Sequence, residues 1–283
     1  MLMDGKELAR DIKDKIKAEI DDIKRIYNVN PTVASILVGE DPASQVYLNS
    51  QIKSYQDLGI GVQKYFFSKE ISEAYLLNLI DKLNKDTEVD GIMINLPLPP
   101  QISATKVLNR IKLIKDVDGF KAENLGLLFQ NNEDFISPST PAGIMELIKG
   151  YKIDLEGKDV VVIGRSNIVG KPVAALVLNS HGTVTICNSH TKNLKEKTKT
   201  ADVLISAVGK PKFITADMVK EGAVVIDVGI NRVNGKLEGD VDFENVQKKT
   251  SYITPVPGGV GALTVAMLLS NILKSFKANR GII

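Results

Sequence analysis

The chain has 283 residues, enough for two domains with cores of their own, and its 36 lysines and arginines nearly balance its 34 aspartates and glutamates. This balance argues against a nucleic-acid-binding protein, which would concentrate positive charge on one face. The single cysteine, Cys187, excludes an internal disulfide framework, and with only two histidines no Cys/His metal site is expected.

Neither end of the chain predicts a secretory or membrane segment. The N-terminal stretch is charged from its fourth residue and has no apolar signal core. The longest apolar run near the C-terminus, Ala262 to Leu269, is too short to cross a bilayer. We therefore expect a soluble, cytoplasmic protein without a membrane partner.

The first half of the chain alternates helical and strand-like segments. Apolar residues recur at helical spacing over 8–23, and a buried strand is expected over 32–39. Asp41 and Pro42 suit the cap and first turn of a second helix, which should end at Gly59. Two further strands, VQKYFF and VDGIMIN, flank a helix around AYLLNLIDKLN, and the prolines of LPLPP end the last strand.

This alternation predicts a parallel sheet covered by helices, with binding loops at the carboxyl ends of its strands. Three loops become site candidates: GEDPAS after the first strand, NLPLPP after the third, and KDVDGF at 115–120. The segment ISPSTPAG at 136–143, with two prolines and small polar residues, is the clearest crossover to the second half.

A second α/β series follows the crossover. Strands are expected over KDVVVIG, TVTICNS, ADVLISAVG and GAVVIDVGI, with helices after the first two. Asn234 and Gly235 then form a strong tight-turn signal for a hairpin. A glycine-rich bend, TPVPGGVG, leads into a last apolar helix.

The segment VVIGRSNIVGKP at 161–172 is a variant of the dinucleotide-binding turn. A strand precedes it, a helix follows, and another strand lies about twenty residues on. Gly164 permits a sharp turn, and the helix N-terminus offers N–H groups and positive dipole to a phosphate. Ser166 replaces the middle glycine of the usual fingerprint and adds a hydroxyl donor. The alternative is an ordinary strand-to-helix turn.

The next strand favours NADP over NAD. NAD-specific sites place an acid at the end of this strand, whereas here it ends in Asn188, Ser189 and His190. Arg165 lies in the turn, within reach of a 2′-phosphate, and its alternative role is that of a solvent-exposed loop cation.

With GEDPAS, LPLP, KDVDGF, GRSNIVGKP, VIDVGIN and TPVPGGVG in this order, the chain resembles the methylenetetrahydrofolate dehydrogenase/cyclohydrolase family of one-carbon metabolism. The resemblance covers essentially the whole chain, and the motifs together are highly specific. It implies two α/β domains across a cleft: a folate-binding catalytic domain over 1–138 and a Rossmann-type NADP domain over 139–260. It further implies a C-terminal helix, 261–283, that returns to the first domain, tetrahydrofolate derivatives as substrates, and a homodimer.

Carried over position by position, the resemblance implies two sets of site residues. Tyr47 would border the folate ring system, and Asp118 would hold the donor groups of the pterin. Further substrate contacts are expected from Asn95, Leu96, Pro97, Pro257, Gly258 and Gly259. Cofactor contacts are expected from Gly164, Arg165, Ser166, Ser189 and Ile230.

Three positions depart from the family pattern. Gln51 stands where the family has a lysine one turn after its tyrosine, Asn95 replaces a glutamine, and Lys121-Ala122 replaces histidine-proline. Hydride transfer needs only two aligned planar partners. Hydrolysis of the methenyl product needs a titratable group, and the amide of Gln51 cannot exchange protons.

We therefore predict an NADP-dependent dehydrogenase, with Tyr47, Gln51 and Asp118 at its catalytic site, whose cyclohydrolase activity is lost or strongly reduced. The alternative is a bifunctional enzyme in which Lys121 or another group transfers the proton. Two other functions fit less of the sequence. A folate- or nucleotide-binding regulator needs no nicotinamide beside the folate. A dehydrogenase of amino or hydroxy acids normally carries an acid/base pair and lacks the LPLPP and PVPGGVG bends.

Overall fold

A computed structural model of the chain describes residues 1–39, 42–132 and 134–282, except for the side chains of 42–44, 46, 47 and 50. The chain divides into two compact units, each built from separate segments. The three-stranded unit comprises Ile12–Gly126, Asp134–Ile136 and Leu268–Ile283. The five-stranded unit comprises Met1–Asp11, Leu127–Glu133 and Ser137–Met267.

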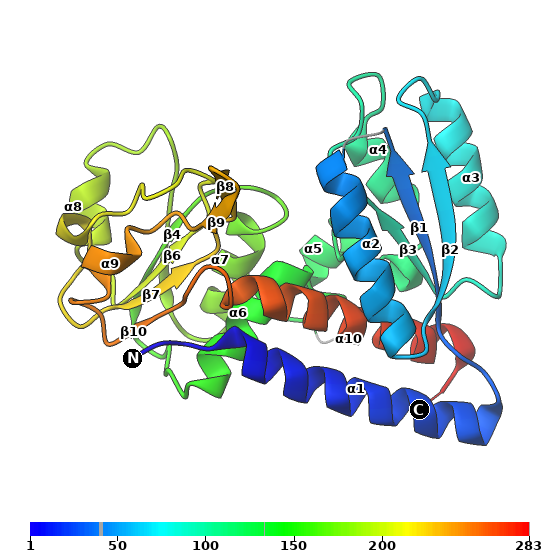
Figure 1. The fold of residues 1–283 in the computed structure, drawn as a ribbon, viewed down its shortest axis with the longest axis horizontal. Helices are drawn as coiled ribbons and strands as arrows, with labels where there is room; N and C mark the ends of the chain where they lie inside the picture. The colour runs from blue at the N-terminus through cyan, green and yellow to red at the C-terminus, as the bar shows by residue number, and fades with distance from the viewer. Residues whose placement is uncertain (40–41, 133, 283) are drawn as a thin grey trace. The chain divides into compact units, whose positions relative to one another are not determined.

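The three-stranded unit is a parallel sheet between helices, as the alternation predicts (Figure 1). Its strands, in the order β2-β1-β3, are β1 (Thr32–Val38), β2 (Gly61–Phe67) and β3 (Gly91–Ile94). Alternate residues of β1 and β3 pack against α3 and α4, and on the other face Tyr55 of α2 donates to the sulfur of Met93. The helices are α2 (Pro42–Asp57), α3 (Glu73–Lys85), α4 (Ala104–Arg110) and α5 (Ala122–Phe129), with a 3₁₀ turn, η1 (Leu113–Lys115).

The C-terminal helix, α10 (Val260–Arg280), supplies the last segment of this unit. Its Ser275 and Asn279 side chains donate to the carbonyl oxygen of Asp90 at 2.6 and 2.7 Å. The predicted return of this helix to the first domain is thereby confirmed. By length and composition alone α10 is apolar enough to cross a membrane, but more than half of its most apolar window is buried, as in a core helix.

The five-stranded unit is a second parallel sheet, in the order β10-β7-β6-β4-β5. Its inner strands β4, β6 and β7 are buried at every residue except Asp159, and they are apolar except at their ends, because helices and loops cover both faces. The strands are β4 (Asp159–Ile163), β5 (Thr183–Cys187), β6 (Val203–Ser206), β7 (Val224–Asp227) and β10 (Tyr252–Ile253). The helices are α6 (Ser139–Gly150), α7 (Gly170–Asn179), α8 (Leu194–Thr198) and α9 (Phe243–Val246), with a 3₁₀ turn, η2 (Ala216–Met218); α1 (Gly5–Tyr27) begins in this unit.

Two local signals of this unit can be compared with the structure. The hairpin of β8 (Asn231–Val233) and β9 (Lys236–Glu238) is confirmed, with positive φ at both turn residues, 49° at Asn234 and 77° at Gly235. The crossover segment already contains the start of α6, at Ser139. Pro141 is tolerated there because it lies in the first helical turn, where its missing N–H breaks no helical hydrogen bond.

Candidate functional site

Two of the three candidate loops meet at the end of β3 in the three-stranded unit. Ile92 forms a parallel bridge with Asp116, and Asp118 accepts a backbone hydrogen bond from Ile94, the residue before NLPLPP. The loop KDVDGF therefore lies against the strand that carries NLPLPP. Of the third loop, GEDPAS, residues 40 and 41 lie outside the described residues, as do the side chains of 42–44.

Asp118 has an unusual protonation equilibrium. Burial, together with the neighbouring Asp116 carboxylate, raises the pKa of Asp118 to about 8. Its side chain still keeps part of its surface exposed. At neutral pH this carboxyl is mostly protonated, so it offers a ligand both an O–H donor and an acceptor.

The loop that presents Asp118 is held by two buried polar residues. Asp116, which is 1 % exposed, accepts a hydrogen bond from Nδ2 of Asn124 at 2.7 Å. Asn271 of α10 donates from Nδ2 to the carbonyl oxygen of Val117 at 2.9 Å. The backbone on the N-terminal side of Asp118 is thus fixed from within the loop and from the C-terminal helix.

Gln51 has a buried side chain in α2 and is 5 % exposed. Its Oε1 has no hydrogen-bond partner among the described residues. A buried polar atom left without a partner costs about 1–3 kcal/mol, so such an atom is expected where a ligand or water supplies the donor. The side chain of Tyr47, one turn earlier, lies outside the described part of the structure.

The other two positions that depart from the family pattern are engaged by backbone carbonyls. Asn95 donates from Nδ2 to the carbonyl of Ile36 in the neighbouring strand at 3.0 Å, so its amide is anchored to the sheet. After it, Leu96 is half-buried and Pro97 is exposed. Lys121 donates from Nζ to the carbonyl of Asn109 at 2.6 Å, at the end of α4.

The remaining predicted substrate residues, Pro257, Gly258 and Gly259, form a bend in the five-stranded unit. The carbonyl of Gly258 accepts from the N–H of Gly5 at 2.9 Å, and Gly258 itself has a φ of 116°. A Cβ on Gly5 would lie 2.1 Å from the carbonyl oxygen of Gly259. Position 5 therefore needs glycine because the start of α1 lies directly against the bend, and position 258 favours glycine because of its positive φ.

The dinucleotide-type turn is formed as the sequence predicts, between β4 and α7. Gly164 has a φ of 129°, and a Cβ on Gly170 would lie 2.2 Å from the carbonyl oxygen of Gly164. The hydroxyl oxygen of Ser166 accepts from the N–H groups of Val169 and Gly170 at 3.1 and 3.3 Å. Ser166 was expected to donate to a ligand, and its hydroxyl oxygen also stabilises the turn by accepting these two backbone hydrogen bonds.

Arg165 and Ser189 leave the five-stranded sheet at the same edge. Ile163 of β4 is in register with Cys187 of β5, and each site residue lies two positions further along its own strand. Both side chains are exposed, as a guanidinium and a hydroxyl that bind phosphate must be. Ile230, 64 % exposed, follows β7 at the same carboxyl edge.

Sequence reasoning missed the residues that hold these loops. Asp116, Asn271 and the carboxylate of Asp240 bind loop backbone. Asp116 lies in the KDVDGF motif but was given no role there, and Asn271 and Asp240 stand in none of the motifs identified. A weak signal existed, since Gly229 and Gly239 flank the hairpin and a glycine often marks close backbone approach. In the described part of the chain, no group of three or more metal-binding side chains is found.

Comparison with known proteins covers both halves of the chain. Residues 3–118 match the catalytic domain of tetrahydrofolate dehydrogenase/cyclohydrolase, and residues 138–280 match the NAD(P)-binding domain of the same enzyme. The chain is 88 % identical to the bifunctional protein FolD of Fusobacterium nucleatum, over 100 % of both chains.

Two solved structures have the same fold over nearly their whole length. The bifunctional FolD of Campylobacter jejuni gives a TM-score of 0.96 at 48 % identity, covering 98 % of this chain and 99 % of that one. The Trypanosoma brucei enzyme, complexed with NADP and an inhibitor, gives 0.94 at 34 % identity, covering 98 % and 97 %.

Proposed function

Because the chain belongs to the tetrahydrofolate dehydrogenase/cyclohydrolase family, we propose that it oxidises 5,10-methylenetetrahydrofolate to 5,10-methenyltetrahydrofolate with NADP. The observation that carries the choice of cofactor is the sheet edge that presents Arg165 and Ser189 side by side, on strand ends without an acid. The Trypanosoma brucei relative, described with bound NADP, supports the same choice over NAD.

In this reaction the protein binds and aligns rather than transfers protons. The methylene carbon gives up a hydride, and its flanking nitrogens share the positive charge that results. Asp118 is proposed to hold the pterin, because a protonated carboxyl pairs with a donor and an acceptor on the same ring edge. The neutral amide of Gln51 adds no charge where the methenyl cation forms.

We propose further that hydrolysis of the methenyl product to 10-formyltetrahydrofolate is retained. The relatives in Fusobacterium nucleatum and Campylobacter jejuni are described as bifunctional, which supports two activities over the loss predicted from Gln51 alone. An amide still cannot move a proton, so the titratable group must be another one. Asp118, with a pKa of about 8, titrates in the useful range, and Lys121 is the second candidate.

One purified sample tests both proposals. Formation of NADPH from methylenetetrahydrofolate measures the first activity, and decay of the methenyl chromophore above its uncatalysed rate measures the second. Absence of NADPH formation would refute the dehydrogenase proposal. A working dehydrogenase without hydrolysis would instead support the loss of cyclohydrolase, and Gln51→Lys should then restore hydrolysis.

We also propose a cytoplasmic homodimer without nucleic-acid or membrane partners, as the family resemblance implies. Exposed apolar side chains on the five-stranded unit, Ile186 on edge strand β5 and Leu178 on α7, support self-association. Sedimentation equilibrium tests the proposal, and a monomer at micromolar concentration would contradict it.

A further inference from the structure

Two buried aspartates lie at the carboxyl edge of the five-stranded sheet, outside the predicted site. Asp227 is the last residue of β7 and is 3 % exposed. Asp240 follows the β8-β9 hairpin and is 0 % exposed. Buried carboxylates require hydrogen-bond donors, and here the donors come from loop backbone.

Asp240 binds three consecutive backbone N–H groups in the loop that follows β6. Its Oδ2 accepts from Val208 at 2.7 Å and from Gly209 at 3.2 Å, and its Oδ1 accepts from Lys210 at 2.9 Å. Oδ1 also accepts from Nδ2 of Asn231 at 3.1 Å. A single carboxylate thus fixes the path of the whole loop.

Asp227 holds Asp240 in place. Oδ1 of Asp227 accepts from the N–H groups of Gly229 and Asp240, each at 2.9 Å. Oδ2 of Asp227 accepts from the N–H of Val241, also at 2.9 Å. The two side chains therefore act in series: Asp227 fixes the backbone of Asp240, and Asp240 fixes the loop after β6.

The glycines around this pair are required by close contact. A Cβ on Gly229 would lie 2.2 Å from Oδ1 of Asp240, and a Cβ on Gly239 would lie 1.9 Å from Oδ2 of Asp227. A Cβ on Gly164 would lie 2.5 Å from the carbonyl oxygen of Ala207. The loop that Asp240 fixes is therefore packed directly against the dinucleotide turn.

The strand order decides which half of a dinucleotide these loops face. In a doubly wound sheet the pyrophosphate lies at the turn after the first strand, here β4, and the adenosine ribose at the end of the second, here β5. The loops after β6 and β7 lie on the opposite side of β4 from β5. They therefore line the nicotinamide half of the site.

We propose that Asp240, backed by Asp227, is a positioning residue that shapes the backbone against which the nicotinamide half of the dinucleotide binds. The adenosine half depends instead on Arg165 and Ser189. The inference rests on the proposed dinucleotide site. Asp240 itself does not contact the cofactor in this proposal. It acts by fixing the backbone of the loop after β6.

The test separates the two halves of the cofactor. NADP and 2′,5′-ADP, which lacks the nicotinamide half, are titrated calorimetrically into wild type and Asp240→Asn. An amide has one acceptor oxygen where the carboxylate has two, so loop N–H groups lose their partner. We expect NADP affinity to fall about tenfold, with 2′,5′-ADP affinity unchanged. Unchanged NADP affinity, or an equal loss for both ligands, would overturn the inference.

Two further variants keep this result interpretable. If Asp240→Asn does not fold, Asn231→Ala removes one donor from the same carboxylate, and we expect the same selectivity with a smaller loss. Equal weakening of both ligands there would again overturn the inference. A wild type that binds neither NADP nor 2′,5′-ADP would refute the dinucleotide site itself, and this outcome is distinct from a failure of Asp240.

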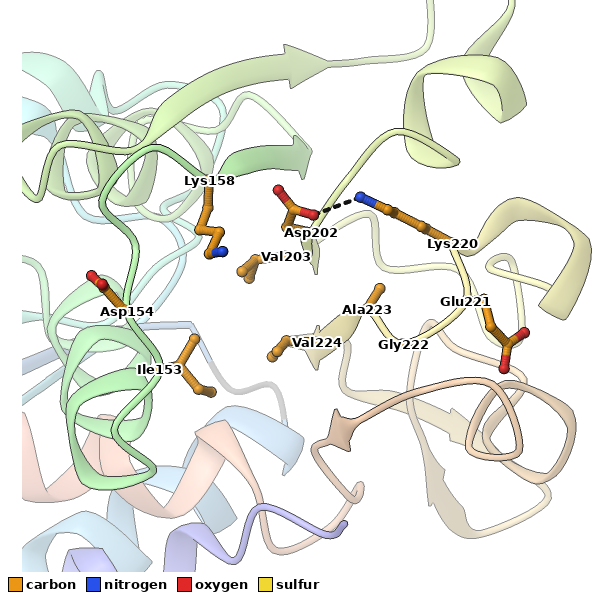
Figure 2. Close-up of a pocket in the computed structure, with 10 residues that line it drawn as sticks. All are labelled: Ile153, Asp154, Lys158, Asp202, Val203, Lys220, Glu221, Gly222, Ala223 and Val224. Atoms are coloured by element: carbon orange, nitrogen blue, oxygen red, sulfur yellow. Dashed lines mark hydrogen bonds and ion pairs between the residues drawn. The ribbon is translucent and has the colours of Figure 1, made fainter.

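The matched control is Asp202→Asn, at the amino end of β6. Asp202 accepts from the N–H of Asp159 at 3.0 Å. It also pairs with Nζ of Lys220 at 2.6 Å, and both side chains line a pocket (Figure 2). This substitution also removes a carboxylate that binds a backbone N–H, but at the first residue of β4, the end of that strand away from the turn. We expect both affinities to stay at the wild-type value, and a selective loss of NADP binding would overturn the role given to Asp240.

Discussion

Each unit contains a pair of aspartates beside a strand of its parallel sheet, β7 in one unit and β3 in the other, and the two pairs differ in how their carboxyl groups are used. Asp227 and Asp240 are both bound by backbone N–H groups, and burial raises the pKa of Asp227 to about 6 against the lowering effect of those donors. In the three-stranded unit Asp116 accepts from the backbone N–H groups of Phe120 and Lys121, while Asp118 accepts from that of Ile94, keeps exposed surface and has a pKa of about 8. A carboxylate whose oxygens accept several loop N–H groups stabilises the loop. A carboxyl group that lies beside the loop and accepts few hydrogen bonds remains available to a ligand.

The largest expected effect comes from Asp118→Ala, which removes both the donor and the acceptor that the protonated carboxyl offers to a ligand. We expect kcat/KM for methylenetetrahydrofolate oxidation to fall by about a hundredfold, because a hydrogen bond to a charged or ionisable partner contributes about 1.5–3 kcal/mol to binding. Steady-state NADPH formation measures it. The loop should stay intact, since Asp116 holds it, and a variant with near wild-type kcat/KM would remove Asp118 from the site.

The same substitution should change how stability depends on pH. The folded pKa of Asp118, about 8, lies above the unfolded value of about 3.9. The unfolded chain therefore binds fewer protons between these values, and the stability contributed by the protonated group is lost as the pH rises toward 8. Urea unfolding of wild type and Asp118→Ala should show wild-type stability falling relative to the variant from about pH 4 to about pH 8 and levelling above that. Parallel pH profiles would contradict the raised pKa.

A smaller effect is expected from Asn271→Ala, which releases the backbone beside Asp118. The buried carbonyl of Val117 loses its donor, so we expect a loss of about 1–2 kcal/mol in the free energy of unfolding. The KM for methylenetetrahydrofolate should rise a few-fold while kcat stays near wild type. Asn279→Ala is the matched control, because Asn279 donates to Asp90 from the same helix. It should lower stability similarly and leave KM unchanged, and equal KM changes in both variants would contradict the role of Asn271.

The smallest effect is expected from Gln51→Met, which replaces a buried amide, whose Oε1 has no partner among the described residues, with an apolar side chain of similar length. Removing a polar atom without a partner should raise the free energy of unfolding by about 1 kcal/mol. Thermal unfolding measures the gain. Lower stability would show that Gln51 makes a contact with the native structure that outweighs its unpaired oxygen.

The features that could be predicted from the sequence are those that depend on residues close together along the chain. The turn at Gly164, the hairpin at Asn234 and the alternation of helices and strands are local, because a few residues determine each of them. The residues that stabilise the loops depend on distant partners: Asp240 binds Val208 32 positions away, and Asn271 binds Val117 154 positions away. No local pattern encodes such pairs. Strand β10 was missed for a different reason, since two residues are too few to show a period.

Each end of the chain belongs to a unit whose strands lie in other parts of the sequence. Leu2 forms a bridge with Ile253, and Gly5 binds Gly258, so the five-stranded unit incorporates residues 1–11. The three-stranded unit incorporates 268–283. We therefore expect that dividing the chain between its two halves would give two fragments that are each unable to fold alone.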